Sequence, residues 1–420
     1  MANFRVVAFG RRDFDDMSYR QFVFREALQG DSQSAVILEK ISYVKGEFKD
    51  ASSYRRLGDK LSSVDAKEFK KCSNKLFYLA VPPVHYEVII SELSLSGLTI
   101  PCGGDLGWTR VLLEKPFGSD LETAKRLDLL LAKHFKEEQI FRIDHYLAKE
   151  SLQNILAFRF SNSIFEPLWS RKFVERVEIN FFEERTVAGR GLFYDGLGAL
   201  LDVGQNHLLA MLSLIAMKKP KDLSAGALHK ERAKVLGRLK IFCGQEGVFR
   251  RAQYEGYRSE SGVAPDSEAE TFFTVAAAVL NLRWRNVPFL LSAGKALNES
   301  KVEIRIIFRK DDGRLNQNEL IFKIRPSEGI AIKFFAKKPG LGSEEIEEKI
   351  LSFNYDDDAG KNKASDAYEK VLYDAVLGDQ TLFASTAEVS AAWKFIAKVR
   401  GHWKQAPLKT YKKGSRVEEI

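Results

Sequence analysis

The first part of the chain alternates short apolar runs with stretches of helical periodicity. Strands are predicted at residues 5–9, 75–81 and 109–113, and helices at residues 18–28, 83–95 and 119–135. This alternation is typical of a parallel α/β sheet. We expect Ser119 and Glu122 to form a capping box at the start of the last of these helices.

Beyond residue 170 the hydrophobic period changes to two. Val177, Ile179 and Phe181 alternate with polar residues, and residues 302–308 repeat the pattern. Several such strands follow one another between residues 272 and 339 with gaps short enough for antiparallel hairpins. Helices are predicted at 199–216 and 365–376, and a polar loop at 355–364. The chain therefore reads as an α/β domain over residues 1–145 and an α+β domain over residues 146–420.

Composition favours a water-soluble protein. The chain has 420 residues, 45% hydrophobic and 29% charged, which suits two globular domains. No run of 18 apolar residues and no signal-peptide pattern occurs, so a membrane is not an expected partner and the expected location is cytoplasmic. The net charge of +8 comes from 65 basic residues interleaved with 57 acidic ones. That mixture favours a small anionic substrate over nucleic acid.

The three cysteines give no sign of a metal site. Cys72, Cys102 and Cys243 are widely separated in the sequence, whereas metal-binding cysteines usually occur in closely spaced pairs. An odd number in a chain of this length also argues against a disulfide framework. We therefore expect reduced thiols.

One candidate site lies where a predicted strand ends in Asp144 and a predicted helix begins. The helix would carry His145 and, four residues later, Lys149 on the same face. A helix start also has unpaired N–H groups and a positive dipole end, so this face would suit a dianion such as a phosphate. The alternative is an ordinary solvated helix start.

His207 and Lys115 are two further candidates for chemistry. His207 follows Asp202 at the start of a strongly apolar helix, and it could accept a proton at neutral pH if a carboxylate held its ring. A buried histidine with a structural hydrogen bond is the alternative. Lys115 ends an apolar strand, and side chains at the carboxyl ends of parallel strands face the ligand crevice. A surface lysine is the alternative there.

Together these segments resemble the glucose-6-phosphate dehydrogenase family over nearly the whole chain. The matching motifs are Glu-Lys-Pro-Phe-Gly at 114–118, Arg-Ile-Asp-His-Tyr-Leu-x-Lys-Glu at 142–150, Phe-Glu-Pro-Leu-Trp at 165–169, Gln-Asn-His-Leu-Leu at 205–209, Gly-Lys-Ala-Leu at 294–297 and Gly-Asp-Gln-Thr-Leu-Phe at 378–383. The resemblance implies a Rossmann-like dinucleotide-binding domain followed by a larger substrate-binding and dimerisation domain with a mainly antiparallel sheet and helices.

The resemblance also implies a role for each matching residue. His207 corresponds to the general base and Asp144 to the carboxylate that holds it; His145, Tyr146 and Lys149 correspond to the phosphate-binding residues; Lys115, Glu183, Asp202 and Lys295 correspond to residues that bind the sugar; and Arg11, together with Lys115, corresponds to the cofactor side, with Arg11 at the 2′-phosphate of NADP. The implied reaction oxidises glucose 6-phosphate at C1 to 6-phosphogluconolactone, with hydride transfer to NADP and no metal. A homodimer or homotetramer is implied as well.

The sequence departs from the family pattern at the cofactor side. The family's first strand leads into a Gly-x-x-Gly-Asp-Leu turn, which does not occur here, and the partial match at 103–106 precedes a predicted strand. Without that strand, its two neighbours in the sheet would have unpaired backbone groups. The alternative function is therefore a relative that binds sugar phosphate or assembles but has little dehydrogenase activity. Ala148 and Ser300 also replace a glycine and a basic residue of the family.

Overall fold

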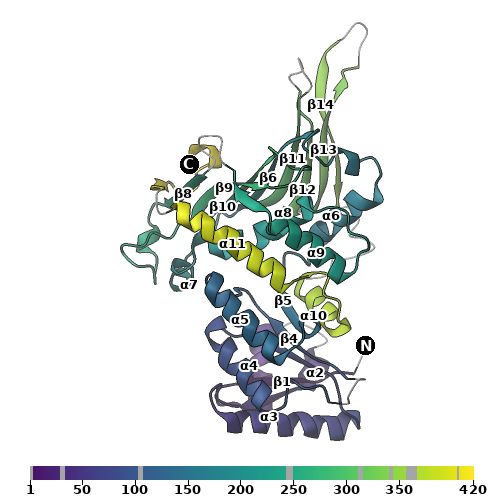
Figure 1. Ribbon diagram of the computed structural model, residues 1–420. Helices are drawn as coiled ribbons and strands as arrows, with labels where there is room; N and C mark the ends of the chain where they lie inside the picture. The colour runs from purple at the N-terminus through teal and green to yellow at the C-terminus, as the bar shows by residue number, and fades with distance from the viewer. Residues whose placement is uncertain are drawn as a thin grey trace. The chain divides into compact units, whose positions relative to one another are not determined.

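A computed structural model describes residues 3–28, 34–102, 107–242, 249–310, 316–339, 344–355, 367–403 and 406–420. It divides into two compact units, which are described separately. The first comprises Met1–Phe117 and Lys125–Arg142, and the second comprises Gly118–Ala124 and Ile143–Ile420 (Figure 1). The segment at 103–106, Cys243 and most of the predicted loop at 355–364 lie outside the described residues.

The first unit contains the predicted parallel strands. Its strands are β1 (Val6–Gly10), β2 (Ile41–Lys45), β3 (Lys75–Leu79), β4 (Thr109–Leu113) and most of β5 (Ile140–Ile143), and its helices include α1 (Asp16–Val23), α3 (Ala51–Val64) and α4 (Tyr86–Leu95). β1 pairs with β2, and β3 with β4 and β4 with β5, all in parallel. The predicted strands at 5–9, 75–81 and 109–113 are confirmed. β2 and α3 were not predicted from the hydrophobic pattern.

The parallel strands of the first unit lie in two sheets. Among the described residues of this unit, β1 pairs only with β2, and β3 pairs only with β4. Val6 on β1 is 42% exposed and Tyr78 on β3 is 40% exposed, so neither strand is covered as a central strand would be. The described part of the chain thus has a break between β1 and β3.

The expectation of reduced thiols is wrong for two of the three cysteines. Cys72 and Cys102 form a disulfide, with their Cα atoms 5.6 Å apart. Cys72 follows the segment that begins with α3, and Cys102 follows α4, which packs against α3. The chain thus brings together two residues 30 positions apart, a proximity that spacing alone does not indicate.

The second unit is built on a mixed ten-stranded sheet. In spatial order its strands are β14 (Ile346–Asn354), β13 (Gly329–Lys337), β12 (Glu319–Arg325), β11 (Lys301–Phe308), β6 (Val174–Phe182), β10 (Pro288–Gly294), β9 (Phe272–Val279), β8 (Phe249–Tyr254) and β16 (Leu408–Tyr411), with β7 (Leu239–Ile241) paired to β9. All neighbours are antiparallel except β6 with β10 and β8 with β16. Ile179 lies opposite Ile304 and both are buried, which confirms the predicted period-two strands.

The second unit also contains several helices, and some of them pack against this sheet. They include α6 (Glu150–Ser161), the π-helical segment η7 (Leu200–Leu208), α8 (Leu209–Ala216), α9 (Ala225–Leu236), α10 (Ala367–Leu377) and α11 (Thr386–Trp403) (Figure 1). η7 packs against β6 and β10, and α6 packs against β12 and α8. The predicted helix at 199–216 is therefore confirmed, although its first half has the wider π-type turn.

One predicted helix cap is displaced by a single residue. Asp120, not Ser119, caps α5 (Leu121–His134): the Thr123 N–H donates to Asp120 Oδ1 at 2.8 Å, and the Asp120 N–H donates to Thr123 Oγ1 at 3.0 Å. Serine and aspartate are both favoured N-cap residues, so the sequence alone did not decide between Ser119 and Asp120.

None of the helices in the described part of the chain is long and apolar enough to cross a bilayer.

Candidate active site

Asp144 begins a tight turn, not a helix. The Tyr146 N–H donates to Asp144 Oδ1 at 3.1 Å, and the Leu147 N–H donates to Asp144 O at 3.0 Å. α6 begins only at Glu150, so the prediction that His145 and Lys149 share one helical face is wrong. An aspartate side chain that accepts from the backbone two residues later favours such a turn over a helix.

The turn places Asp144 against His207. The Nδ1 atom of His207 lies 2.6 Å from Asp144 Oδ1, and the two side chains are 1% and 5% exposed. His207 comes from η7, so the pair joins two segments 63 residues apart. A carboxylate on Nδ1 orients the imidazole and leaves Nε2 as the atom that can exchange a proton with a substrate. The expected carboxylate partner of His207 is therefore present.

Aromatic rings surround this pair. The ring of His207 lies 4.2 Å from that of Tyr146 and 5.0 Å from that of His145, and it stacks on Phe181 at 6.1 Å. Burial raises the pKa of Tyr146 well above its ordinary value, although the nearby Arg325 opposes this. The Tyr146 phenol is thus protonated at neutral pH and can donate a hydrogen bond.

Lys149 is held by an acidic residue that the sequence did not single out. Its Nζ lies 3.1 Å from Glu328 Oε1, while Glu328 Oε2 accepts from the Ser151 N–H at 2.9 Å. Glu328 follows β12 in the sequence and comes 179 positions after Lys149. Only the tertiary fold brings the two together, because nothing in the local pattern around Glu328 marks it.

Lys295, Glu183 and Asp202 form a second polar cluster. Lys295 Nζ lies 2.5 Å from Glu183 Oε2 and 3.7 Å from Asp202 Oδ2, and Lys295 is only 9% exposed. The three line a cavity of about 10 Å³ together with Phe181, which also contacts His207. That space is roughly what one water molecule needs. The structure therefore brings this cluster next to the His207 pair.

A buried glutamate anchors the segment that carries Asp202 and His207. Glu270 Oε1 accepts from the Leu200 N–H at 2.8 Å, at the start of η7. Gly198 has φ +67°, and a Cβ there would lie 2.5 Å from Glu270 Oε1, so only glycine fits. Burial raises the pKa of Glu270 to about 7. Glu270 lies just before β9 in a segment without any motif, so nothing in the sequence marks it.

The two cofactor-side predictions fall in the first unit. Arg11 is exposed directly after β1, with its guanidinium 5.4 Å from the centre of the Phe48 ring. Lys115 follows β4, is partly buried and precedes Pro116 through a cis peptide bond. Both therefore lie at the carboxyl ends of parallel strands, as expected for Lys115.

The two smaller departures from the family pattern lie in the second unit. Ser300 Oγ accepts from the Glu184 N–H at 3.0 Å, next to the strand end that carries Glu183. Ala148 is buried in the turn after Asp144, and its carbonyl accepts from Gln153 Nε2 at 2.9 Å. The Ser300 hydroxyl thus has a hydrogen-bond partner, whereas the hydrogen bond at Ala148 uses only its backbone carbonyl.

Comparison with known protein families gives matches on both parts of the chain. Residues 1–154 match the family described as "Glucose-6-phosphate dehydrogenase, NAD binding domain". Residues 156–419 match the family described as "Glucose-6-phosphate dehydrogenase, C-terminal domain". Together the two matches span almost the whole chain.

Individual relatives agree. A glucose-6-phosphate 1-dehydrogenase from Borreliella burgdorferi is 38% identical over 440 aligned residues, covering 99% of this chain and 88% of that protein. Glucose-6-phosphate 1-dehydrogenase 6, cytoplasmic, from Arabidopsis thaliana is 38% identical, and the alignment covers 90% of this chain and 75% of that protein. A solved structure of glucose-6-phosphate dehydrogenase in complex with its substrate glucose-6-phosphate has a TM-score of 0.90 at 32% identity, covering 98% of this chain and 88% of the other. The chain belongs to the glucose-6-phosphate dehydrogenase family.

Proposed function

We propose that the protein oxidises glucose 6-phosphate at C1 to 6-phosphogluconolactone, with hydride transfer to NADP. The observation that carries this proposal is the buried pair of His207 and Asp144, joined at 2.6 Å. Oxidation of a hemiacetal requires removal of the proton of the anomeric hydroxyl as the hydride leaves C1. A neutral imidazole with a carboxylate on Nδ1 meets that requirement.

His207 accepts the anomeric proton at Nε2, and its ring becomes a positively charged imidazolium. Asp144 stabilises this cation at short range in a site from which water is largely excluded. The Asp144 carboxylate also fixes the ring orientation, because the Tyr146 N–H holds the same oxygen from the backbone side. After the product leaves, Nε2 releases the proton to solvent, and the neutral base is ready for the next substrate.

The remaining polar residues position the sugar phosphate. The 6-phosphate binds the ammonium group of Lys149 and hydrogen-bond donors of His145 and Tyr146. Lys149 either leaves its ion pair with Glu328 or keeps it while it binds the phosphate. Lys295 donates to sugar oxygens, while Glu183 and Asp202 accept from sugar hydroxyls. A fixed sugar next to a fixed base lowers the barrier mainly through orientation.

The chain carries the family's domain for a nicotinamide cofactor. Bound NADP supplies the hydride acceptor. The residues present fit its 2′-phosphate, since Arg11 and Arg12 are both exposed at the carboxyl end of β1, where parallel sheets bind ligands. Their guanidinium groups lie over Phe48 and Phe22, each at 5.4 Å from the ring centre, so both are oriented before any ligand binds. We assign Lys115 to the same side.

A turnover assay tests the proposal. Purified protein is mixed with glucose 6-phosphate, glucose or fructose 6-phosphate, and with NADP or NAD, and reduced cofactor is followed by absorbance. We expect turnover with glucose 6-phosphate above that with glucose, and preference for NADP over NAD. Equal rates with glucose and glucose 6-phosphate would contradict the assignment of the phosphate-binding residues.

A second candidate function is a sugar-phosphate-binding relative with little dehydrogenase activity. The observation that favours it is the break between β1 and β3 in the first unit, together with the lack of a Gly-x-x-Gly-Asp-Leu turn in the sequence. All the residues assigned to the sugar phosphate except Lys115 lie in the second unit. Calorimetric binding of glucose 6-phosphate without any NADP reduction would support this candidate over the first.

We also propose a homodimer or homotetramer in the cytoplasm. The edge strand β14 supports assembly, because it pairs only with β13 in the described part of the sheet and exposes Ile346, Ile350, Leu351 and Phe353. An exposed apolar edge strand of this kind is usually covered by another chain. The cytoplasmic assignment follows the Arabidopsis thaliana relative.

A further inference from the structure

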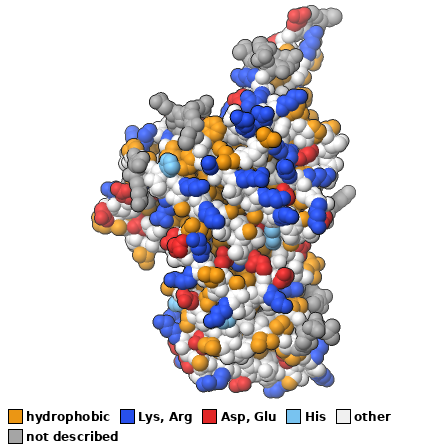
Figure 2. Space-filling view, in the orientation of Figure 1, with side chains coloured by type: hydrophobic (Ala, Val, Ile, Leu, Met, Phe, Trp, Pro, Cys, Tyr) orange, Lys and Arg blue, Asp and Glu red, His pale blue; other side chains and the backbone are white. Residues whose placement is uncertain are grey.

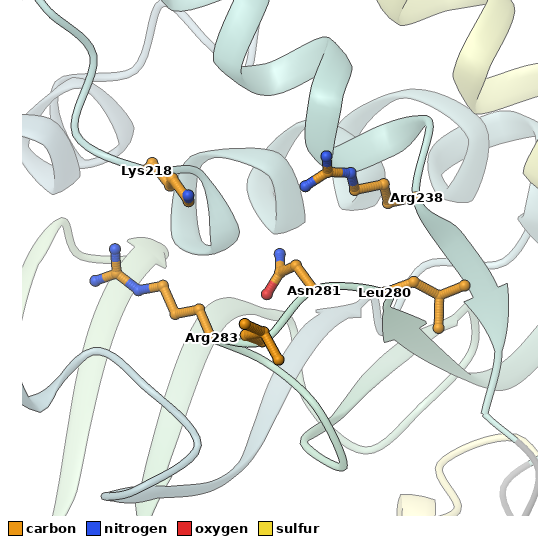
Figure 3. Close-up of a pocket in the computed structure, with 6 residues that line it drawn as sticks. Lys218, Arg238, Leu280, Asn281 and Arg283 are labelled. Carbon is orange, nitrogen blue, oxygen red and sulfur yellow. The ribbon is translucent and has the colours of Figure 1, made fainter.

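A cavity of about 530 Å³ in the second unit shares no residue with the candidate active site. Its lining consists of Lys218, Arg238, Leu280, Asn281, Leu282 and Arg283. Figure 3 shows the side chains of Lys218, Arg238 and Asn281 directed toward a common space from three different segments. The volume falls in the range of about 300–1,000 Å³ that small-molecule sites occupy.

Backbone pairing holds two of these segments together. β7 pairs with β9, with Leu239 opposite Val279, and the Leu280 N–H donates to Arg238 O at 3.0 Å. Arg238 immediately precedes β7, and residues 280–283 immediately follow β9. The guanidinium and the two leucines thus extend from the ends of paired strands, not from a free loop.

The third segment, which carries Lys218, is fixed by the end of α8. The last carbonyls before Lys218 all accept from buried side chains: Leu214 and Met217 from Arg159 at 2.6 and 2.9 Å, Ile215 from Trp169 at 2.7 Å, and Ala216 from Trp284 at 2.8 Å. The negative end of a helix would normally oppose a bound anion. Here those carbonyls already accept hydrogen bonds from buried side chains, so they oppose a bound anion less.

Asn281 presents donors to the cavity. Its Oδ1 accepts from the Trp284 N–H at 2.9 Å, which leaves the side-chain NH₂ group for the cavity. The amide, ammonium and guanidinium groups that face the space are therefore all hydrogen-bond donors.

The charge near the cavity is strongly positive. Glu166 lies 2.6 Å from Arg283 and 3.2 Å from Arg159, so one carboxylate serves two guanidinium groups. Burial lowers the pKa of Arg159 to about 10; Glu166 opposes this, and the Arg283 charge adds to it. Within the described chain, the charged groups of Lys218 and Arg238 have no acidic partner. The cavity thus has positively charged hydrogen-bond donors whose charge no carboxylate of the described residues neutralises.

We propose that this cavity is a binding site for a small organic phosphate, such as a nucleotide. The phosphate groups bind Lys218, Arg238 and the Asn281 amide, and the apolar part of the ligand covers Leu280 and Leu282, which are 51% and 78% exposed. This site goes beyond the proposed dehydrogenase function and does not depend on it.

Calorimetry with ATP, pyrophosphate and adenosine, all without metal ions, tests the site. The main variant is the double substitution Lys218→Gln and Arg238→Gln. Its control is Lys221→Gln with Lys240→Gln, which removes the same charge from exposed positions nearby that do not line the cavity. Other phosphate-binding sites of the chain contribute equally to the parent and to both double variants. We expect ATP to bind at least tenfold more weakly to the main variant and within twofold of the parent to the control.

A single substitution protects the test against misfolding. Asn281→Asp keeps the oxygen that accepts from Trp284 and places a negative charge where the NH₂ group faced the cavity. It should also weaken ATP binding at least tenfold. Adenosine should not bind detectably and pyrophosphate should bind more weakly than ATP. Unchanged ATP affinity in Asn281→Asp, loss of affinity in the control, or adenosine binding as tight as ATP would each overturn the proposal.

Discussion

At the scale of single residues, the position of one carboxylate determines what a histidine can do. Asp144 is anchored by the Tyr146 N–H and bonds Nδ1 of His207, so proton exchange is confined to Nε2. The same turn places His145 and Tyr146 around the imidazole. A change at His207 should therefore act on proton transfer and leave the sugar-phosphate contacts in place.

We expect His207→Asn to lower kcat by about 10²–10⁴-fold, the usual contribution of a general base, while glucose 6-phosphate affinity changes less than about fivefold. Asparagine keeps a donor toward Asp144 but cannot accept the proton. Steady-state kinetics give kcat, and calorimetry gives the affinity. A variant with near-normal kcat would show that another group is the base.

Lys149 and Glu328 allow a second test at this scale. Lys149→Ala should weaken glucose 6-phosphate binding tenfold or more, since a charge-assisted bond contributes roughly 1.5–3 kcal/mol, and should leave glucose unaffected. Glu328→Gln removes the competing carboxylate and should not weaken glucose 6-phosphate binding. The exposed substitution Lys394→Ala is the control. Equal losses for glucose and glucose 6-phosphate would place the phosphate elsewhere.

At the scale of elements, a buried carboxyl group controls the start of η7. Burial raises the pKa of Glu270 to about 7, whereas an unfolded chain has a glutamate of ordinary pKa. Between these two values the unfolded state loses its proton before the folded state does. The contribution of Glu270 to stability is thus fully present below about pH 4.5 and is lost as the pH rises to about 7.

Glu270→Gln should remove that loss. The free energy of unfolding of the variant relative to the parent should rise by about 3 kcal/mol between pH 4.5 and 7.5, because glutamine still accepts from Leu200 but never ionises. Urea unfolding at a series of pH values measures it. Glu268→Gln, at an exposed neighbouring position, is the control and should show no such trend. A pH-independent difference for Glu270→Gln would contradict the raised pKa.

At the scale of the whole molecule, the two units differ in how complete their sheets are. The second unit has one continuous ten-stranded sheet, and the first has its parallel strands in two sheets with β1 and β3 at the edges. Basic and acidic side chains are mixed over the face seen in Figure 2, as the interleaved charges in the sequence indicate.

We expect the 420-residue chain to bind glucose 6-phosphate but to bind NADP about a hundredfold more weakly than the same chain preceded by a strand and a Gly-x-x-Gly-Asp-Leu turn. A helix-start phosphate site supplies several N–H donors and a favourable dipole, and Arg11 contacts only the 2′-phosphate in our assignment. Calorimetry on both chains measures the ratio. Micromolar NADP affinity in the 420-residue chain would show that other residues bind the pyrophosphate.

The sequence by itself determined the elements whose apolar period is clear and the residues whose motifs are local. The strands at 75–81 and 109–113, the strand containing Ile179 and the helix leading to His207 all follow from the side-chain periods that burial imposes. Tertiary structure alone decided the partnerships of Lys149 with Glu328, of Leu200 with Glu270 and of Cys72 with Cys102. Those contacts join segments between 30 and 179 positions apart, and a local pattern contains no information on which distant side chain the fold will place opposite.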